Sequence, residues 1–345
     1  MNIPTQFIAA SRYMVSPSFR VINDHLECRG FGGDIILTTA LMEPHPDFEW
    51  FAIKKWPTME ANTLQIKPTG LHFKYQGQPQ KAAIESSREF PEGSHPDYSH
   101  DVAYTEQSIT ADETLHLDAV KSFMSRDETR YVLMGALCGK EYVATDGRRL
   151  IELKSGYTGT PFIMPAAVVN ILVTLHKKIP STFWRWNLNE VDGEIVDVKI
   201  DTDSFTVQFK AVGGNYPNWR QVIPVIDQKT VHFIPAQGDL PSFCAWLRGR
   251  NNVTFTPHRG KIMVYDNVTT ASAFFSGYLS AQAIYNGDFF KSMLEVPGLL
   301  QMSAEGAENS ALFEFHRGTG VLMPMRGNVD DNTILEAAEH LLAIT

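Results

Sequence analysis

The sequence has little of what would cross-link a protein or anchor it in a membrane. Its 345 residues include 3 cysteines, Cys28, Cys138 and Cys244, which lie far apart and form no C-x-x-C pair, so neither a disulfide framework nor a structural zinc site is expected. We interpret them as buried thiols. Apolar runs such as residues 166–175 are far shorter than the roughly 20 residues that span a bilayer. Residues 1–16 lack the pattern of a secretory signal, so the cytoplasm is the expected compartment.

The motifs of well-known catalytic sites are absent too. The sequence contains no G-x-S-x-G, H-E-x-x-H, Walker A or G-x-G-x-x-G pattern, and the glycines of 30–33 have the spacing of a hairpin turn. Asp201, Thr202 and Asp203 are typical of a polar turn before a strand rather than of a metal site. We therefore predict no catalytic residue, no metal and no cofactor. A hydrolase that uses two of the many carboxylates remains a remote alternative.

The charge balance limits the classes of partner. With 30 Lys and Arg against 39 Asp and Glu, the net charge is −9, which argues against a uniformly basic surface that coats nucleic acid and leaves a local basic surface open. Hydrophobic residues at 43% and charged residues at 20% are typical of a folded chain, and the length favours two or three domains.

A pattern of helix, hairpin strands, helix and hairpin strands recurs three times, with about 110 residues in each round. Helices are predicted at 5–13, 51–62, 117–127, 166–176, 240–248 and 288–294. Strands are predicted at 33–40, 64–67, 71–75, 81–85, 131–137, 141–144, 149–153, 183–188, 194–200, 205–211, 253–256, 261–265, 271–278, 299–303, 311–316 and 321–325. The predicted fold class is α+β. Its expected domains are 1–104, 105–224 and 225–327, with a linker at 91–100 and a C-terminal helical extension at 328–345; three unrelated small domains are the alternative.

Five segments carry a more specific signal. They are T-R-Y-V-L-M-G-A-L at 129–137, V-A-T-D-G-R-R-L at 143–150, F-I-M-P at 162–165, G-N-Y-P-N-W-R-Q-V-I-P at 214–224 and V-L-M-P-M-R at 321–326. This ordered set resembles the beta subunit of bacterial DNA polymerase III, the sliding clamp. Its members carry R-Y-x-L-N-G, A-T-D-G-H-R-L, a V-P helix start, F-P-D-Y-R-x-V-L-P and V-x-M-P-M-R in the same order.

The resemblance covers 111–326 well and is faint in 1–98, so the chain is identified as a divergent member. Three positions depart from the family pattern. Arg148 stands where the family usually has His, Val132 where some members have a second Tyr, and Gln221 where a basic residue is common. These departures bear on partner affinity and DNA contacts more than on the fold.

The resemblance implies three similar clamp-type domains, each with two helices packed on antiparallel sheets, and a head-to-tail homodimer that closes a ring around duplex DNA. The implied function is to tether a replicative polymerase and other partners to DNA for processivity without catalysis of its own, and the implied location is the cytoplasm, in association with the nucleoid. The polymerase and the clamp loader would bind through linear peptides, and no membrane is involved. A divergent paralogue that stays monomeric, or that binds a partner without encircling DNA, is the main alternative.

Two sets of site residues follow from the resemblance. The partner-peptide groove between the second and third domains is expected to comprise Leu133, Thr145, Gly147, Arg148, Arg149, Leu150, Pro217, Val222, Val321, Leu322, Met323, Pro324 and Met325. Thr145 and Arg149 would hold the peptide backbone or a polar anchor. The DNA-facing residues are expected to be Lys121, Arg126, Arg130, Tyr131, Lys177, Lys178, Arg248, Arg250 and Lys291. The helices expected to line the hole are net positive although the whole chain is acidic.

The C-terminal extension has a pattern of its own. Thr333 and Glu336 have the spacing of a capping box, and an apolar stripe follows, which predicts a helix. We expect it to dock on the partner groove or the flank of the third domain and to regulate partner access, with a frayed surface helix as the alternative.

Overall fold

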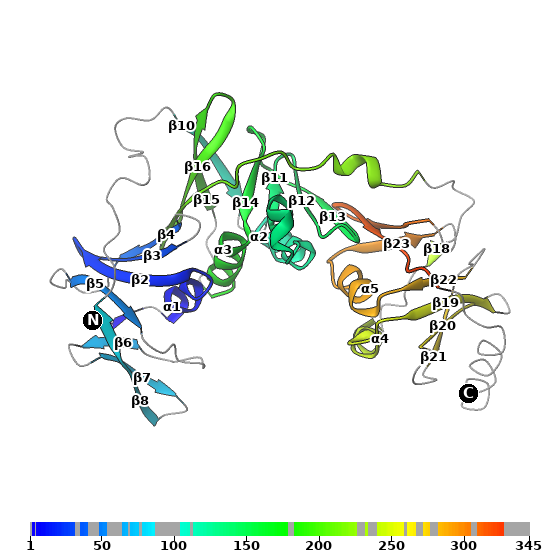
Figure 1. Ribbon diagram of the computed structural model, residues 1–345, viewed down its shortest axis with the longest axis horizontal. Coiled ribbons are helices and arrows are strands. Elements are labelled where there is room, and N and C mark those ends of the chain that lie inside the picture. The colour runs from blue at the N-terminus through cyan, green and yellow to red at the C-terminus, as the bar shows by residue number, and fades with distance from the viewer. Residues whose placement is uncertain are drawn as a thin grey trace. The chain divides into compact units, whose positions relative to one another are not determined.

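The structure, a computed structural model, describes residues 2–3, 5–31, 35–40, 48–53, 64–67, 70–75, 78–86, 104–110, 113–178, 183–225, 232–233, 240–258, 261–266, 272–276, 282–304 and 309–327. The chain forms two compact units (Figure 1). Unit 1 comprises Met1–Lys121, Met134–Tyr142 and Ser155–Asn215, and unit 2 comprises Ser122–Leu133, Val143–Lys154 and Tyr216–Thr345. The boundary passes through strand β12 (Glu141–Thr145).

A nine-stranded antiparallel sheet dominates unit 1. Its order is β10 (Tyr104–Thr110), β15 (Phe183–Val191), β16 (Glu194–Asp201), β17 (Thr206–Lys210), β4 (Ile35–Ala40), β3 (His25–Phe31), β2 (Val15–Ile22), β5 (Phe48–Ile53) and β9 (Ile84–Ser86). Strands from the N-terminal and central parts of the chain meet where β17 pairs with β4, with Thr206 opposite Thr38 and Gln208 opposite Ile36. The two parts of the chain therefore share one sheet.

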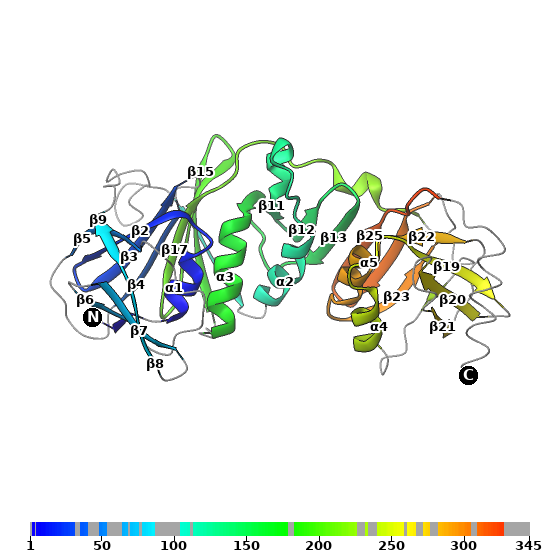
Figure 2. The same ribbon diagram turned by 60° about the horizontal axis from the view of Figure 1, so that its bottom comes forward.

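Three helices belong to unit 1: α1 (Thr5–Ser11), α2 (Glu113–Val120) and α3 (Ala166–Lys178). Helix α3 packs against both α1 and α2, and Figure 2 shows α1 and α3 side by side. Because α3 is covered on several sides, its apolar residues are buried almost all round, Val169, Ile171 and Leu172 among them. The short strands β11 (Gly135–Cys138) and β14 (Phe162–Pro165) form an antiparallel pair. A small sheet contains β1 (Asn2–Ile3), β6 (Leu64–Lys67), β7 (Gly70–Tyr75) and β8 (Gln78–Ala82).

Unit 2 has two antiparallel sheets and a pair of helices. Five strands of one eight-stranded sheet run in the order β13 (Arg149–Lys154), β25 (Gly318–Leu322), β24 (Ala311–Phe315), β23 (Leu299–Ser303) and β18 (His232–Phe233). The other runs β21 (Ser272–Ser276), β20 (Lys261–Asp266), β19 (Val253–His258) and β22 (Ala283–Tyr285). Helices α4 (Leu240–Leu247) and α5 (Gly287–Leu294) pack together. The fully buried Phe290 joins these layers, since its ring contacts those of Phe243, Phe255, Tyr285 and Phe313.

The predicted α+β class is confirmed, since antiparallel sheets with few helices make up both units. Helices near 5–13, 166–176, 240–248 and 288–294 are found, as are most of the predicted strands. The turn expected at 201–203 is confirmed as well, because Thr202 Oγ1 accepts hydrogen bonds from the backbone N–H groups of Ser204 and Phe205 between β16 and β17. Strands β2, β3 and β10 were not predicted.

Four predicted elements are wrong in part. Residues 51–53 belong to β5, so a helix over 51–62 does not begin there. Helix α2 ends at Val120 and a 3-10 turn, η1 (Lys121–Phe123), follows it, so the helix does not continue to 127. Strand β25 ends at Leu322 and not at 325.

The fourth correction concerns 131–137, where a strand was expected. Residues Glu128–Met134 form 3-10 turns, η2, that are interrupted by a kink at Arg130, and the strand begins only at Gly135. Asp127 explains the turn, because its carboxylate accepts hydrogen bonds from the backbone N–H and the hydroxyl of Thr129, while the Asp127 carbonyl accepts from the N–H of Arg130.

Several predictions lie outside the described residues: the rest of the 51–62 helix from residue 54, the 91–100 linker and the C-terminal helix within 328–345. The three cysteines are free and buried, as interpreted from their spacing. Burial raises the pKa of the Cys28 thiol well above its ordinary value, so it is held in the neutral form. None of the helices that the structure describes combines the length and apolar character that crossing a membrane requires.

Candidate functional site

The A-T-D-G-R-R segment forms a tight turn between β12 and β13 in unit 2. Asp146 Oδ1 accepts hydrogen bonds from the backbone N–H groups of Arg148 and Arg149 at 2.9 and 3.1 Å. Thr145 Oγ1 accepts from the N–H of Gly147 at 3.0 Å and donates to the Arg149 carbonyl at 2.8 Å. Gly147 has a φ of +85°, which favours glycine. The turn is therefore fixed by its own side chains.

Arg149 connects this turn to two other parts of unit 2. Its Nε donates to Asp146 Oδ2 at 2.9 Å, one terminal nitrogen donates to the Ser122 carbonyl at 2.6 Å, and the other donates to the hydroxyl of Ser292 on α5. The guanidinium carbon lies 5.0 Å from the ring centroid of Phe123 and 4.4 Å from that of Phe289. Arg149 is expected to bind a peptide directly, but its guanidinium already makes these contacts within the chain. A peptide would compete with them.

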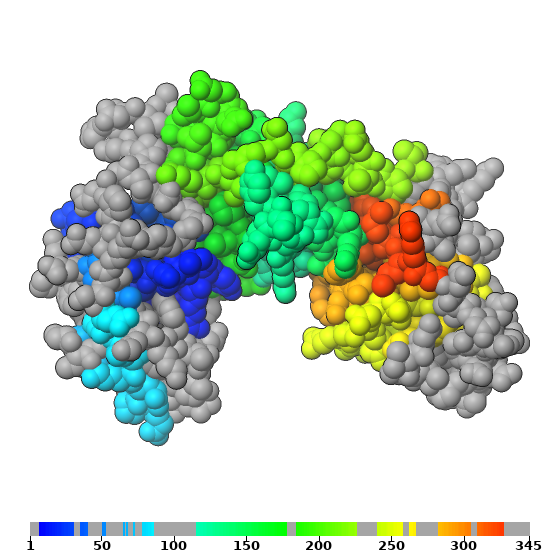
Figure 3. Space-filling view, viewed as in Figure 1, coloured from blue at the N-terminus to red at the C-terminus, as the bar shows by residue number. Residues whose placement is uncertain are grey.

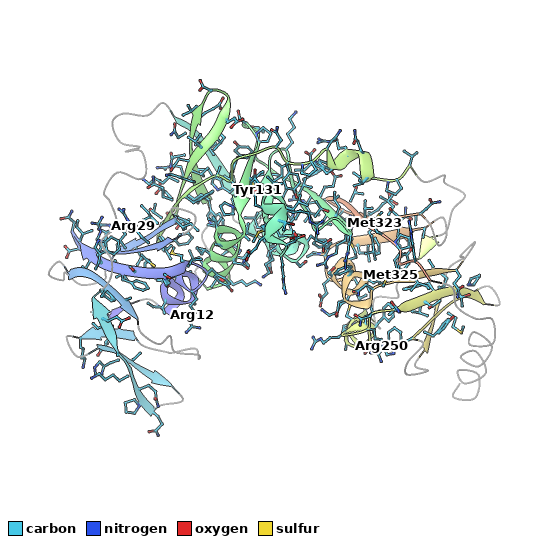
Figure 4. All side chains as sticks on the ribbon, viewed as in Figure 1. Arg12, Arg29, Tyr131, Arg250, Met323 and Met325 are labelled. Carbon is cyan, nitrogen blue, oxygen red and sulfur yellow. The ribbon has the colours of Figure 1, made fainter. Side chains whose placement is uncertain are left out.

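The V-L-M-P-M segment lies directly beside the turn. Strand β25 pairs with β13 so that Leu322 is opposite Arg149 and Val321 opposite Leu150. The Met323 N–H then donates to the Arg148 carbonyl at 2.9 Å, and the Met325 N–H donates to the Ile284 carbonyl of β22 at 2.7 Å. Figure 4 labels Met323 and Met325 on this segment, and part of the segment, in red, lies at the surface in Figure 3.

Burial divides the expected groove residues into two groups. Leu133, Leu150, Val321 and Leu322 are buried. Val222 and Met323 are 52% and 48% exposed, Gly147, Arg148 and Pro217 are also exposed, and Thr145, Arg149, Pro324 and Met325 are half-buried. Only the second group has side chains that a partner could contact in this conformation, whereas the buried group supports the surface from below.

Most of the expected DNA-facing cations already contact carboxylates. Lys121 and Lys177 both pair with Asp118. Arg130 pairs with Asp127, and Lys291 on α5 pairs with Glu295, the residue that follows the helix. Arg250, labelled in Figure 4, pairs with Asp266 at 3.1 Å, and its guanidinium lies over the ring of Trp246.

Arg126 and Arg248 differ from these cations, because both are exposed and neither forms an ion pair within the part of the chain that the structure describes. Tyr131 on η2 is 57% exposed (Figure 4). Lys178 is the last residue of α3, and its side chain lies outside the described ones.

Sequence reasoning missed the residues that hold these positions. Ser122, Phe123, Phe289 and Ser292 around Arg149 carry no local signal, because they come from distant parts of the chain. Asp118 could have been found in part, since Lys121 follows it by three residues on a helical pattern. Within the described ranges, no group of three or more His, Cys, Asp or Glu side chains could hold a metal ion.

Comparisons with known proteins give a clear result at the level of structure alone. No protein-family model matches the chain, and no curated protein matches it. Among solved structures, the chain is similar to the DNA polymerase III beta subunit of Thermotoga maritima, with a TM-score of 0.69, 12% identity, and coverage of 95% of this chain and 99% of the other. It is similar to the DNA polymerase sliding clamp of Pseudomonas aeruginosa, with a TM-score of 0.65, 17% identity, and coverage of 95% and 99%. A third similar structure is the beta clamp of Helicobacter pylori bound to a DNA ligase peptide, with a TM-score of 0.62, 15% identity, and coverage of 94% and 99%.

These similarities extend over nearly the whole of each chain and therefore include most of the first 98 residues, where the sequence resemblance is faint. The chain therefore has the sliding-clamp fold, and its clamp-type domains are built from antiparallel sheets.

Proposed function

We propose that this protein is a divergent sliding clamp of the bacterial DNA polymerase III beta family, which encircles duplex DNA and tethers a polymerase and other partners to it. One observation carries the proposal. In a chain with the clamp fold, the β13–β25 ladder joins the A-T-D-G-R-R turn to the V-L-M-P-M segment, the two motifs that the resemblance assigns to one partner surface.

The partner surface is proposed to centre on the exposed members of the expected groove. Met323 and Val222 offer apolar side chains, and Met325 and Pro324 continue the surface beside them in sequence. Methionine is unbranched and polarisable, so it adapts to apolar side chains of different shapes. The bound DNA ligase peptide in the similar Helicobacter pylori clamp supports a short linear peptide as the ligand, which here would come from a polymerase or a clamp loader.

The contact with DNA is proposed to be electrostatic and independent of sequence. The expected DNA-facing cations lie on or next to helices of both units, and a phosphate backbone attracts such cations without base readout. A ring retains DNA by topology, so it needs no high affinity, and a net charge of −9 is compatible with this role.

The proposal includes three domains at 1–104, 105–224 and 225–327, and a head-to-tail homodimer of this cytoplasmic protein that provides six domains to the ring. It includes no catalytic site, since clamps act as processivity factors. A monomeric paralogue of the same fold is the competing function.

Light scattering coupled to size-exclusion chromatography distinguishes a dimeric clamp from a monomeric paralogue. A clamp should elute with about twice the mass of the 38.7 kDa chain. Loaded by its own loader onto a nicked circle, it should stay bound in high salt and be lost when the circle is cut. A monomeric mass at every concentration, together with equal loss from cut and uncut circles, would reject the ring.

A second experiment tests the peptide surface. Val222→Ala combined with Met323→Ala should weaken a fluorescent clamp-binding peptide at least tenfold, because two exposed apolar contacts are lost. Leu300→Ala is the matched control, since Leu300 is 45% exposed on β23 and is not among the expected groove residues. Equal affinities for the double variant and the control would show that the peptide binds elsewhere.

A further inference from the structure

A single carboxylate in unit 1 holds two of the expected DNA-facing lysines. Asp118 lies in the last turn of α2, Lys121 follows at the start of η1, and Lys177 lies in the last turn of α3. One carboxylate oxygen contacts the ammonium of Lys121, and the other lies 2.6 Å from the ammonium of Lys177. The two lysines, 56 positions apart in the sequence, therefore converge on one anion.

Helix stability does not explain why an acid stands at this position. The C-terminal end of a helix carries partial negative charge, so a carboxylate in the last turn of α2 is disfavoured by the helix dipole. All three side chains also reach solvent, with 28% of Asp118, 33% of Lys121 and 55% of Lys177 exposed. Ion pairs with this much exposure contribute little to folding.

The electrostatics show that the carboxylate is nevertheless held in its charged form. Burial would by itself raise the pKa of Asp118, but hydrogen bonds from Lys121 and Lys177, together with their charges, outweigh that effect and leave the pKa below its ordinary value. At neutral pH the trio therefore carries a net charge of about +1 instead of the +2 that the two lysines would carry alone.

We propose that Asp118 is an internal competitor of DNA phosphate. Its carboxylate occupies the position between Lys121 and Lys177 where a phosphate would bind, and so keeps the affinity of this surface for DNA low. The inference rests on the proposed function and adds a regulating residue to its DNA-facing surface. A phosphate has to displace the carboxylate before it gains both ammonium groups. For a ring that is retained by topology, weak contact has a direct use, because strong binding would slow sliding.

Asp118→Asn tests the inference, since asparagine keeps the shape of the side chain and removes its charge. The probe is a short linear duplex, titrated against the full-length protein by fluorescence anisotropy between about 50 and about 200 mM salt. Each additional phosphate neutralised adds about 0.9 to the salt slope of the affinity, and the variant frees one or two lysines. Asp118→Asn should therefore bind the duplex more tightly than wild type at low salt. The ratio of the two affinities should fall by roughly 3- to 12-fold across that range of salt.

Two control variants make the result specific. Glu194→Gln removes one negative charge from the exposed start of β16, a strand that carries none of the expected DNA-facing residues, and so reproduces the change in net charge alone. Asp118→Asn in a Lys121→Gln, Lys177→Gln background should lose the advantage, because no ammonium remains to be freed. Thermal unfolding of each variant confirms that it folds.

The outcomes separate the inference from the proposed function. If Asp118→Asn and Glu194→Gln shift affinity and salt slope equally, Asp118 is not a competitor, although the protein still binds DNA. If Asp118→Asn shows no salt-dependent binding to duplex, the inference fails, and retention on a closed circle tests the proposed function separately. Lysine acetylation read by mass spectrometry gives a further check, because duplex should protect Lys121 and Lys177 more strongly in Asp118→Asn than in wild type. Equal protection would overturn the inference.

Discussion

Arg149 on β13 donates a hydrogen bond to the hydroxyl of Ser292 on α5, a residue 143 positions further along the chain. The same guanidinium reaches the backbone at Ser122 and the carboxylate of Asp146. The turn that precedes β13 is thus attached to a helix and to a 3-10 segment through one side chain, and the shape of the proposed partner surface depends on it.

Replacing Arg149 should therefore lower the stability of the protein, whether or not a peptide contact is also lost. Lysine cannot reproduce the planar set of donors, so Arg149→Lys should lower the free energy of unfolding by about 1 to 3 kcal/mol in urea titrations. The neighbouring Arg148→Lys, at an exposed position, should stay within about 0.5 kcal/mol of wild type. Similar values for the two variants would contradict the linking role of Arg149.

Leu150 and Met323 should separate folding from binding. Leu150 is 2% exposed, so Leu150→Ala should destabilise the protein by about 2 to 5 kcal/mol through the cavity it leaves. Met323 is 48% exposed, so Met323→Ala should lower peptide affinity and leave the urea midpoint nearly unchanged. Fluorescence anisotropy with a clamp-binding peptide and urea unfolding, measured on both variants, check the separation; a large loss of stability in Met323→Ala would refute it.

Gly147 should tolerate a side chain less well than Gly193, although the two glycines have almost the same backbone conformation. Their φ angles are +85° and +83°, so alanine at either position should cost about 1 to 2 kcal/mol of strain. A Cβ at Gly147 would also lie 2.6 Å from a terminal nitrogen of Arg130, whereas nothing lies within 4 Å of one at Gly193. Because that nitrogen ends a flexible side chain that can move aside, differential scanning calorimetry should show only a slightly larger loss for Gly147→Ala, and Arg130→Ala should remove the excess.

The Asp118 ion pairs should contribute to stability only above acid pH. The pKa of the folded carboxyl lies below its ordinary value of 3.8, so the contribution is present above that value and is lost as the pH falls through the lower folded pKa. Because the groups are partly exposed, the difference in stability between wild type and Asp118→Asn should be small at pH 7 and absent in strong acid. Urea titrations at several pH values test this, and a gap that widens in acid would contradict it.

Sequence patterns predicted an element correctly where the residues of that element alone determine its structure. Helix α3 was found because Pro165 and a long apolar run define it, and the turn at 201–203 because Thr202 bonds to its own neighbours. The segment 131–134 was predicted as a strand because Tyr131 and Val132 favour strands by type, whereas Asp127, outside the apolar run, imposes the turn.

The sequence predicts which residues belong to the candidate site, but it does not predict which of them are buried and which are exposed. Leu150 and Met323 are both apolar, and only the pairing of β13 with β25 shows that one faces the core while the other reaches the surface. Pairing of Asp118 with Lys177 likewise depends on the packing of α2 against α3, which no local spacing reveals.

The pairing of β17 with β4 also determines how the chain can be divided. A fragment that begins near residue 105 would keep β17 and lose β4, which exposes the main-chain groups of Thr206, Val207 and Gln208 along an uncovered sheet edge. Such an edge recruits strands from other molecules, so the fragment should aggregate even though every residue of its own core is present. The strands from β10 to β17 therefore depend on the N-terminal strand β4 to cover the edge of their sheet.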